Sequence, residues 1–532
     1  MKEDRDKRMR ITVTGTGEKS IKPLLEERGV SLYAPCSGRG TCGRCAVIVE
    51  TDNCPPSDRD IERFSKDELG QGFRLACRAF PKGDVTVRVP EEENPVICTD
   101  YSDKSALPHT SRNTQTSERD FGILIGIDLG TTTIVLTSNE RVGTPVKTRA
   151  FLNPLSRYGS DVVSRLEAAE NGKLFEMQSL LRGRIEEELR YMIDSSVSAS
   201  DHPGHSGSNR CPGDVRIALA GNTTMTHIFM GWDTSGLGTF PFKPYSLSPA
   251  ETSLCGFPVF VFPGISAFVG GDIVAGIYGL DLINGNVGDM LMDLGTNGEI
   301  VLKTEKGLIA SSASAGPAIE GAHLSCGTGC VEGAVTGVTL ENLRPVLTVA
   351  GEKAPVSKGL AGACGSAILE LVDELLRTGI LKPDGSFIES YADEGFAFGT
   401  DRNGKVLALT QADVRELQLA KGAVSTAAML LCEKGNVAPE SLNISLAGGM
   451  GSGLRPERIK RTGIIPSCDS VHAVGNSSLM GLMKFLRESS GPENKNTAVK
   501  TVSDLAGSVT VYDPALEKGF QERFMASLNF LQ

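Results

Sequence analysis

Residues 122–137 read GILIGIDLGTTTIVLT, in which a continuous apolar run stops at a Gly/Thr turn and then resumes. Such a run is typical of a buried strand, so the stretch predicts a strand, a tight turn and a second strand. The same order returns at residues 288–302, GDMLMDLGTNGEIVL. Two Asp-Leu-Gly-Thr hairpins in one chain indicate a duplicated α/β fold. Helical spacing of apolar residues predicts helices at 164–170, 174–193, 367–378 and 410–434.

Each hairpin places a carboxylate at the end of its first strand, Asp128 in one and Asp293 in the other. A carboxylate there can hold Mg²⁺ through water or orient an attacking water, so we expect both residues to be catalytic. Backbone amides and hydroxyls of the turns can bind phosphate oxygens. The expected phosphate contacts are Gly130, Thr131, Thr132, Gly295, Thr296 and Asn297. One such turn is more often an ordinary hairpin, whereas two between apolar strands favour a nucleotide site.

A third motif lies at 445–453, SLAGGMGSG, where a predicted strand runs into small residues ahead of a predicted helix. A backbone without side chains can approach a flat ring or a sugar closely, so Gly448, Gly449 and Gly451 are candidate nucleotide contacts. Taken alone, the motif could equally be a tight strand–helix turn. The chain has no G-x-x-x-x-G-K-[ST] sequence, which disfavours a P-loop ATPase.

Four cysteines near the start of the chain have the spacing of a metal-cluster site. Five residues separate Cys36 from Cys42, two separate Cys42 from Cys45, and thirty-one separate Cys45 from Cys77. Plant-type ferredoxins hold a 2Fe–2S cluster with a similar pattern, although their first gap is four residues. Glycines within the loop let backbone amides turn toward the sulfurs. We expect these four cysteines to bind iron, and a zinc site or a coincidental Cys-x-x-Cys is the less favoured alternative.

The residues around these cysteines predict a small β-rich α+β unit like a β-grasp ferredoxin. Its expected strands are 11–14, 45–50 and 84–89, and a short helix is expected at 22–28. A polar segment rich in Ser and Thr follows and contains almost no large apolar residues. We interpret it as a flexible linker that lets the cluster domain swing between partners, or as a mere spacer.

The 532 residues carry a net charge of −11, and 40% of them are apolar. These values suit several globular domains and disfavour nucleic acid as a partner, because phosphate binding needs clustered Lys and Arg. Thirteen cysteines without a dense paired pattern favour a reducing cytoplasm over a secreted disulfide framework. The charged first ten residues predict no signal peptide, and the most apolar stretch, 257–271, is too short and too interrupted by proline to span a membrane.

In chain order, the Asp128 hairpin, the Asp293 hairpin and the Gly448 turn resemble the first phosphate, second phosphate and adenosine motifs of the acetate/sugar kinase, heat-shock protein and actin superfamily. That resemblance implies a duplicated ribonuclease-H-like, actin-like α/β ATPase fold, with ATP and Mg²⁺ bound between its two halves. With the N-terminal ferredoxin, five further runs resemble the reductive activators of corrinoid-dependent enzymes: 153–161, 220–225, 315–321, 362–366 and 415–422.

The resemblance to reductive activators implies a function. That family restores corrinoid proteins of methyltransferase systems by returning one electron to inactive Co(II), which gives Co(I), with the help of ATP. The implied partners are a corrinoid protein and a low-potential electron donor, and a homodimer is left open. Some relatives carry 4Fe–4S clusters in a C-terminal domain, but this chain has no such cysteine group there, so it resembles the 2Fe–2S branch.

The expected organisation follows from these motifs. Its segments are a 2Fe–2S ferredoxin domain (1–96), a linker (97–120), a first ATPase part with the phosphate 1 motif (121–218), a second part with the phosphate 2 and adenosine motifs (219–490) and a C-terminal tail (491–532).

Three other functions compete with this interpretation. A small-metabolite kinase with a regulatory ferredoxin domain is the main alternative, since kinases share the superfamily. A non-catalytic electron-carrier scaffold is disfavoured by the paired phosphate hairpins. An activator of 2-hydroxyacyl-CoA dehydratases is disfavoured because those relatives lack an N-terminal ferredoxin.

Several further residues are expected to be structural. Cys326 and Cys330 could suggest a metal site, but two buried or loop cysteines without further ligands are preferred. His323 is expected to be structural as well. Lys421 and Glu416, on a predicted helix, are expected to be surface charges rather than nucleotide contacts.

Overall fold

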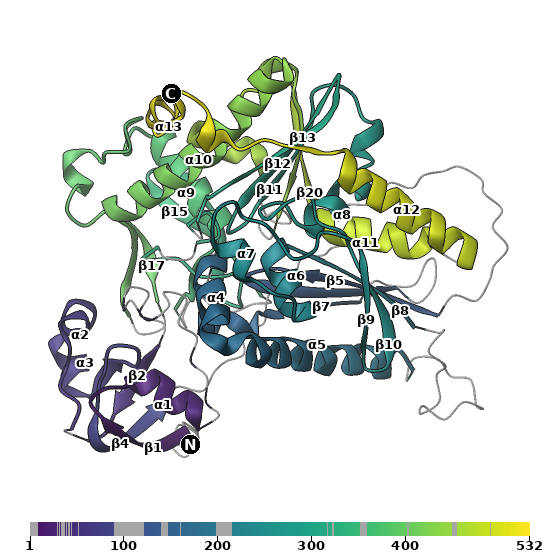
Figure 1. Ribbon diagram of the computed structural model, residues 1–532. Coiled ribbons are helices and arrows are strands. Elements are labelled where there is room, and N and C mark those ends of the chain that lie inside the picture. The colour runs from purple at the N-terminus through teal and green to yellow at the C-terminus, as the bar shows by residue number, and fades with distance from the viewer. Residues whose placement is uncertain are drawn as a thin grey trace.

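Two six-stranded sheets of matching strand order form the body of the molecule, and a smaller four-stranded unit precedes them in the chain (Figure 1). This computed structural model describes residues 9–28, 30, 32, 38, 40, 43, 45–51, 53–89, 122–139, 147–159, 161–197, 215–316, 318–321, 324–351, 359–401, 404–448, 455–489 and 491–531. The predicted linker at 97–120 lies outside the described residues. So do four predicted site residues, Cys36, Cys42, Gly449 and Gly451.

Each large sheet contains one of the two sequence-predicted hairpins at its centre. The first sheet has the order β7 (Lys147–Leu152), β6 (Thr133–Asn139), β5 (Ile123–Leu129), β8 (Val215–Gly221), β10 (Phe257–Val261) and β9 (Ala250–Leu254). The second has the order β13 (Gly307–Ala313), β12 (Gly298–Thr304), β11 (Asp289–Leu294), β19 (Asn443–Ala447) and β20 (Ser470–Gly475), with β21 (Thr510–Val511) outside β13.

The pairing directions of the two sheets also agree. β5 pairs antiparallel with β6 and parallel with β8, just as β11 pairs antiparallel with β12 and parallel with β19. β10 and β20 then extend the two sheets in parallel. The predicted duplicated α/β fold is therefore confirmed, and each Asp-Leu-Gly-Thr turn joins the two central strands of its half.

Helices and two small sheets surround the large ones (Figure 1). The small sheets comprise β14 (Ala334–Glu341), β15 (Arg344–Val349) and β16 (Gly362–Ala363) in one and β17 (Phe396–Thr400) and β18 (Val406–Leu409) in the other. The longer helices are α4 (Val162–Ala168), α5 (Leu174–Val197), α6 (Thr223–Met230), α8 (Gly271–Gly279), α9 (Gly365–Arg377), α10 (Gln411–Gly435), α11 (Ser477–Glu488), α12 (Pro492–Ser508) and α13 (Phe520–Ala526).

The remaining helical segments are short. They are α7 (Ser235–Gly238), η1 (Pro154–Tyr158), η2 (Ala169–Lys173), η3 (Leu282–Asn284), η5 (Glu389–Tyr391), η6 (Pro439–Ser441), η7 (Pro456–Arg458), η8 (Lys460–Thr462) and η9 (Pro514–Leu516). Across the part of the chain that the structure describes, no helix has both the length and the apolarity that a membrane crossing requires.

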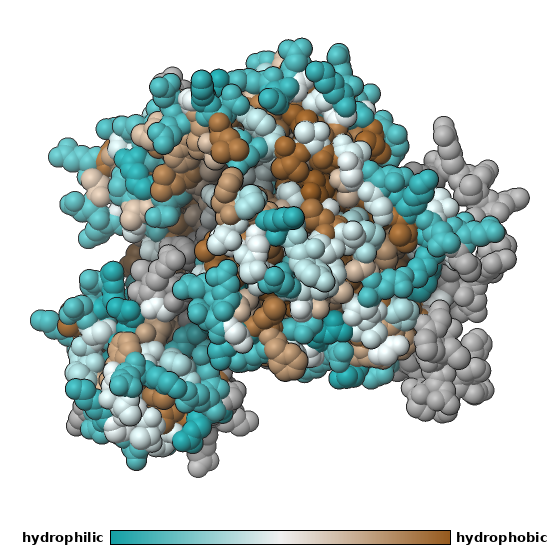
Figure 2. All heavy atoms as spheres, in the orientation of Figure 1, coloured by the Kyte–Doolittle hydropathy of each residue, from teal (hydrophilic) through white to brown (hydrophobic). Residues whose placement is uncertain are grey.

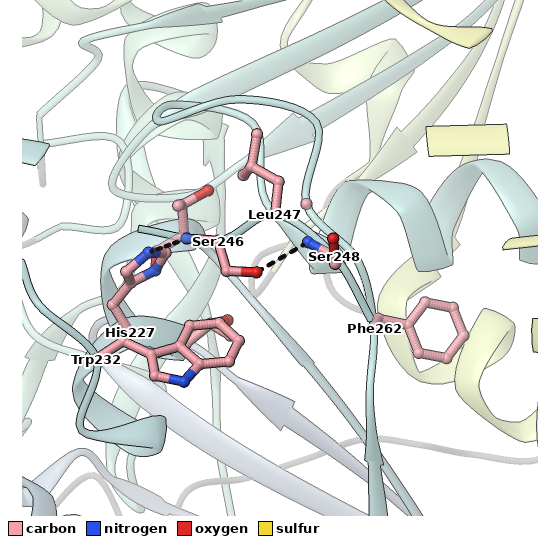
Figure 3. A pocket seen from close by; sticks show the side chains of 10 residues that line it. His227, Trp232, Ser246, Leu247, Ser248 and Phe262 are labelled. Atoms are coloured by element: carbon pink, nitrogen blue, oxygen red, sulfur yellow. Dashed lines mark hydrogen bonds between the residues drawn. The ribbon is translucent and has the colours of Figure 1, made fainter. Parts of the chain in front are cut away.

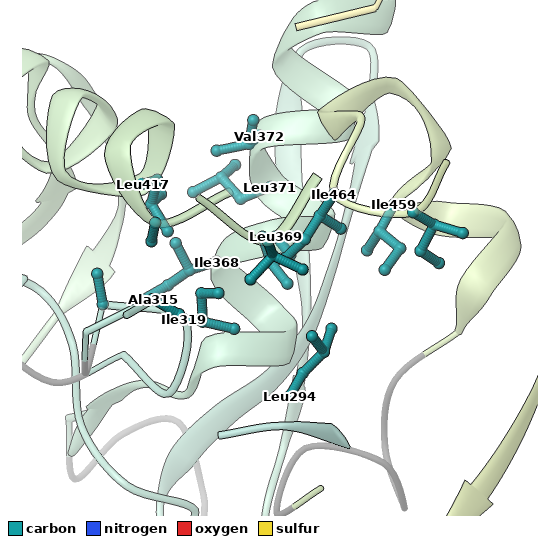
Figure 4. Close-up of a cluster of buried hydrophobic side chains, with 14 of the residues drawn as sticks. Leu294, Ala315, Ile319, Ile368, Leu369, Leu371, Val372, Leu417, Ile459 and Ile464 are labelled. Atoms are coloured by element: carbon teal, nitrogen blue, oxygen red, sulfur yellow. The ribbon is translucent and has the colours of Figure 1, made fainter. Parts of the chain in front are cut away.

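Three hydrophobic cores hold these layers together. The first lies under α5, whose buried residues Met177, Leu181 and Ile185 repeat every four positions and so share one face toward β5 and β8. The second lies between the two large sheets and includes α8, α11 and α12. The third packs α9 and α10 on the far face of the second sheet, and Figure 4 shows Ile368, Leu371 and Leu417 converging there.

The crossing of α8 and α11 brings two backbones unusually close. A Cβ atom at Gly481 would lie 1.8 Å from the carbonyl oxygen of Ala275, and one at Gly279 would lie 2.7 Å from the amide nitrogen of Gly481. Only glycine fits at such distances. Because these helices lie in the core between the large sheets, the crossing sets how closely the two halves can approach.

We expect Gly481→Ala to lower the thermal unfolding temperature, because the added methyl group must push the helices apart at a cost of about 1–3 kcal/mol. Gly507→Ala is the matched control. Gly507 is exposed on α12 with open space where its Cβ would be, so alanine there should stabilise the helix by about 1 kcal/mol. Calorimetry of both variants checks the pair, and equal unfolding temperatures would contradict the packing described here.

The N-terminal unit has the order β1 (Met9–Thr16), β4 (Lys82–Val89), β2 (Ala46–Val49) and β3 (Phe73–Leu75), with α1 (Ile21–Glu27), α2 (Asp58–Arg63) and α3 (Lys66–Gly70). Val85, Val87 and Val89 alternate along β4 and are buried against α1, as expected of a sheet with one covered face. The unit shows mostly hydrophilic residues on the face in Figure 2. The strands and helix predicted from the sequence are present, and the β-rich α+β unit is confirmed.

Lys22 joins this unit to the body of the molecule. Lys22 is 9% exposed, and its ammonium group donates to Glu26 Oε1 at 2.8 Å and to the carbonyl oxygen of Arg157 at 3.3 Å. Arg157 belongs to η1, which directly follows β7. Helix α1 of the small unit therefore lies against the segment 153–159.

The C-terminal residues form hydrogen bonds with the body of the molecule, and one of these contacts contradicts the expectation for Lys421. Lys421 is 3% exposed, not a surface charge, and its ammonium group donates to the carbonyl oxygen of Asn529 at 2.5 Å. Gln418 donates to Leu528, and the amides of Phe530 and Leu531 donate to Pro383 and Arg461. Lys421 faces the tail because it shares the inner face of α10 with Gln418; Glu416 is exposed, as expected.

Candidate functional site

The two predicted phosphate turns meet between the large sheets. The Oγ1 atoms of Thr132 and Thr296 lie 3.3 Å apart, and both hydroxyls donate to Oε2 of Glu320, at 3.0 and 2.9 Å. Gly130 makes the first turn possible, since a Cβ there would lie 2.3 Å from the carbonyl oxygen of Thr133. The fold thus brings together two turns that lie far apart in the sequence.

A cluster of carboxylates surrounds these turns. Its members are Asp128, Asp272, Asp293, Glu299 and Glu320. Burial, followed by the charges of Asp272 and Asp128, raises the pKa of Asp293 to about 8. Burial and the charge of Asp128 raise the pKa of Asp272 to about 7. Burial also raises the pKa of Asp128 itself, opposed by a 2.6 Å hydrogen bond from Asn476 Nδ2.

Because burial and then mutual repulsion raise these pKa values, ionisation of the cluster leaves negative charge that a divalent cation would offset. Among the described residues, no group of three or more His, Cys, Asp or Glu side chains is arranged to hold a metal ion directly. The sequence-based prediction that Asp128 and Asp293 hold Mg²⁺ through water stays a prediction.

The pH dependence of stability tests this cluster. Because the folded-state pKa values of Asp272 and Asp293 lie above the ordinary 3.8, the folded protein binds more protons than the unfolded chain. Their stabilising effect is therefore complete below the unfolded pKa and is lost as pH rises through the folded pKa values. Without divalent cations, the unfolding temperature should therefore fall as pH rises from about 4 to about 8.

Asp293→Asn should flatten that slope, whereas Glu305→Gln, which changes an exposed carboxylate on the turn between β12 and β13, should leave it intact. Thermal unfolding across this pH range, with and without Mg²⁺, measures both. An unchanged slope in Asp293→Asn would contradict the assignment of the raised pKa.

Residues of the runs 153–161 and 220–225 form hydrogen bonds with the first phosphate turn, and so does Arg165. Asn153 Nδ2 donates to the carbonyl oxygen of Gly130 at 2.8 Å, and its own amide donates to that of Thr132 at 2.9 Å. Arg165 is fully buried and donates to the carbonyl oxygen of Thr131 at 2.8 Å; burial lowers its pKa to about 9. Asn222 Nδ2 donates to the hydroxyl of Thr131 at 2.8 Å. The turn is thus held from several sides.

The predicted adenosine motif lies next to the second turn. At Gly448, which follows β19, a Cβ would lie 2.3 Å from the carbonyl oxygen of Leu294 and 3.0 Å from Oδ1 of Asp293. The expected helix after the motif is wrong for the described residues, because residues 456–462 form only the short segments η7 and η8. Arginines tie this stretch to α9: Arg455 makes a two-pronged contact with Glu370, at 2.7 and 2.6 Å.

Two of the four predicted cluster ligands are described, and they lie together. The sulfurs of Cys45 and Cys77 are 3.3 Å apart and buried. Gly38, Gly40 and Gly43 have φ values of 85°, 78° and 71°, so the loop bends through conformations that favour glycine. Two soft donors at this distance, beside a glycine-rich loop, fit an iron–sulfur cluster. Cys54 lies in the hydrophobic core of the unit, where burial raises its pKa.

A small cavity beside α6 is not part of this site (Figure 3). It encloses about 10 Å³, room for about one water molecule. His227 lines it, with Nδ1 2.7 Å from the carbonyl oxygen of Thr223, and burial lowers its pKa. This cavity is too small for a nucleotide.

Sequence reasoning missed four polar residues of the site: Asp272, Glu299, Glu320 and Asn476. Glu299 could have been found, because it begins the second strand of the second hairpin. Glu320 lies in the run 315–321, one of the five that resemble the reductive activators, and nothing in its local sequence assigns it to the phosphate turns. Asp272 and Asn476 precede or begin helices α8 and α11, and no local signal connects them to the hairpins.

Comparisons with known proteins match most of the chain. A 2Fe-2S iron-sulfur cluster binding domain matches residues 4–82, the RACo middle region matches 123–284, and the C-terminal domain of RACo, the ASKHA domain, matches 288–532. "Corrinoid activation enzyme RamQ" from Eubacterium limosum is 29% identical, covering 92% of this chain and 94% of its own.

Two further comparisons concern the fold and the N-terminal unit. A solved structure, "Reductive activator for corrinoid,iron-sulfur protein", has a TM-score of 0.64 at 22% identity and covers 97% of this chain and 96% of its own, so it shares the fold. One component of the Na(+)-translocating NADH-quinone reductase of Neisseria meningitidis is 31% identical over 90 residues, 15% of this chain and 22% of that component.

Proposed function

Because this chain belongs to the family of reductive activators of corrinoid-dependent enzymes, we propose that it reduces inactive Co(II) corrinoid to Co(I) by one electron in a reaction that ATP drives. The observation that carries the proposal is the convergence of Thr132 and Thr296 on Glu320, in a chain whose other unit brings Cys45 and Cys77 together. One unit is built to hold phosphates and the other to hold a redox metal.

The division of labour follows the five segments predicted from the sequence. Residues 1–96 carry the electron, 97–120 tether that unit, 121–218 and 219–490 bind the nucleotide, and 491–532 complete the body. The hydrogen bonds between residues 528–531 and the body of the molecule support a structural role for the last segment.

Cys36, Cys42, Cys45 and Cys77 are the proposed ligands of a 2Fe–2S cluster. Bound there, such a cluster stores one electron at low potential, near about −400 mV for plant-type ferredoxins. The chain's own part is to supply four thiolates, to bury two of them, and to turn the loop through glycines in the left-handed conformation.

The nucleotide would lie over the two turns. Asp128 and Asp293 are the proposed catalytic carboxylates, which would hold Mg²⁺ through water and orient the attacking water. Phosphate oxygens would be bound by the turn residues Gly130, Thr131, Thr132, Gly295, Thr296 and Asn297, and the adenosine by Gly448, Gly449 and Gly451. When ionised, the carboxylates would attract the cation, and the cation would in turn attract the phosphates.

ATP is needed because the electron must travel uphill if the corrinoid couple lies below the cluster. Each ~59 mV uphill costs about 1.4 kcal/mol for one electron. A nucleotide can offset that by favouring one docked state over another. Lys22 of the cluster unit contacts Arg157, and Asn153 of the same segment contacts Gly130 and Thr132. These hydrogen bonds connect the first phosphate turn to the cluster unit.

The proposed partners are a corrinoid protein of a methyltransferase system and a low-potential electron donor, with a homodimer as one form of the assembly. We propose a cytoplasmic location, supported by the thirteen cysteines, which lack the dense paired pattern of a secreted disulfide framework.

Anaerobic mixing of the reduced protein with Co(II) corrinoid proteins, followed by the cobalt spectrum with and without ATP, tests the function. Co(I) should form faster with ATP. Absence of Co(I) with every candidate, together with phosphorylation of a small molecule, would establish the kinase instead. A preparation that stays colourless and free of iron after anaerobic reconstitution would overturn the electron-transfer role.

A further inference from the structure

Two cysteines from separate segments meet behind the nucleotide site. The amide of Thr328 donates to the carbonyl oxygen of Ala363 at 2.8 Å, and the amide of Ala363 donates to that of Cys326 at 2.9 Å, so the two segments run side by side. This pairing brings Cys330 into hydrogen-bonding contact with Cys364. Cys364 is also the N-cap residue of α9, with its sulfur 3.1 Å from the hydroxyl of Ser366.

The surroundings of the two sulfurs differ in a way that suits thiol chemistry. Hydrogen bonds from Cys330, Ser366 and backbone amides at the start of α9 lower the pKa of Cys364 to about 6, although the side chain is buried. A thiolate is the reactive form of cysteine. Cys330 is only half-buried and so is open to small molecules. Burial raises the pKa of nearby Cys326, which is therefore a protonated bystander.

The pair is tied to the carboxylate cluster through one glycine. A Cβ at Gly321 would lie 3.1 Å from the carbonyl oxygen of Ala363 and 3.1 Å from the amide nitrogen of Gly365, so the residues on both sides of Cys364 abut Gly321. Gly321 follows Glu320, which accepts from both phosphate-turn threonines. A shift at Cys364 would therefore move Glu320.

We propose that Cys330 and Cys364 are a reversible dithiol–disulfide site that reacts with low-molecular-weight disulfides and slows ATP hydrolysis when oxidised. The effect on ATP rests on the proposed function, whereas the thiol chemistry does not. Oxidation of this site would slow ATP consumption when the cell is oxidising. Under such conditions a low-potential cluster cannot be kept reduced.

The reaction balances in two exchanges. Half-buried Cys330 passes its proton to the thiolate of Cys364 and attacks a small disulfide, forming a mixed disulfide and releasing one small thiolate, which takes the proton from Cys364. The thiolate of Cys364 then attacks the sulfur of Cys330, forms the Cys330–Cys364 bond and expels the second small thiolate. The two protein thiols lose two electrons and two protons, and the small disulfide is reduced to two thiols.

The test uses the full chain with its cluster reconstituted under anaerobic conditions. The protein is treated with glutathione disulfide or with reduced glutathione, free thiols are alkylated, and the peptides are analysed by mass spectrometry. We expect a linked Cys330–Cys364 peptide only after glutathione disulfide. ATP hydrolysis should fall by about tenfold or more, as small misplacements of active-site groups do, and should recover with dithiothreitol.

Three variants sharpen the outcome. Cys330→Ser should keep its ATP hydrolysis in glutathione disulfide, and Cys364→Ser should retain glutathione on Cys330 without forming the linked peptide. Cys468→Ala, at a half-buried cysteine whose pKa is raised by burial, should behave like the unchanged protein. Absence of the linked peptide in the unchanged protein would overturn the site, even if a variant fails to fold.

A linked peptide with unchanged ATP hydrolysis would overturn the coupling to Glu320. Neither result depends on the corrinoid partner. A failure of the proposed corrinoid reduction would appear separately, as missing Co(I) in a protein that still forms the linked peptide and still hydrolyses ATP.

Discussion

Asp293→Asn is expected to abolish the ATP dependence of corrinoid reduction and to leave the visible spectrum of the cluster unchanged. Asp293 lies among Asp272, Asp128 and Glu320, whose charges add to burial in raising its pKa to about 8. Removing one preorganised electrostatic group from an active site costs about 10²–10³-fold in rate. We expect a loss of ATP hydrolysis of that size, measured by phosphate release.

Glu305→Gln is the control for this variant, because it removes an exposed carboxylate from the neighbouring turn and should leave ATP hydrolysis intact. A cluster spectrum that disappears in Asp293→Asn would mean that the two units do not divide the work as proposed. Hydrolysis that persists at the original rate would remove Asp293 from the catalytic site.

Cys77→Ser is expected to have the opposite effect. The variant should lose its iron and its corrinoid reduction, but it should keep the ATP hydrolysis that occurs without a partner. Cys77 lies 3.3 Å from Cys45, so serine would leave the other sulfur without its soft neighbour. Changes next to a metal ligand already cost about 10–100-fold in metal affinity, and loss of the ligand itself should cost at least as much. Iron content, the visible spectrum and phosphate release measure the three effects.

Cys54→Ala is the matched control, since Cys54 is a buried cysteine of the same unit that packs in its hydrophobic core. It should keep its iron and its spectrum. Loss of iron in Cys54→Ala but not in Cys77→Ser would reassign the ligand set.

The parts of the fold that were predictable are those written in local pattern. The runs around Asp128 and Asp293 are apolar on both sides of a Gly/Thr turn, and that pattern strongly favours a buried hairpin. The alternation of Val85, Val87 and Val89 is equally local. Repetition of one hairpin motif then predicted the duplication without any knowledge of the pairing between strands.

The parts that were not predictable depend on contacts between distant segments. Asn476 donates to Asp128 across most of the body of the chain, and Asp272 joins the cluster only because α8 and α11 cross between the sheets. Lys421 looked like a surface charge because lysine on a helix usually is one. Its acceptor, the carbonyl oxygen of Asn529, lies far along the sequence.

The buried seam between α10 and residues 528–531 has a practical consequence. The last carbonyl and amide groups of the chain satisfy Gln418, Lys421 and Arg461, and Phe530 is buried. An affinity tag at the C-terminal end would lie close to these contacts, whereas a tag placed ahead of Met1 would not. Recombinant protein for spectroscopy is therefore best purified with an N-terminal affinity tag.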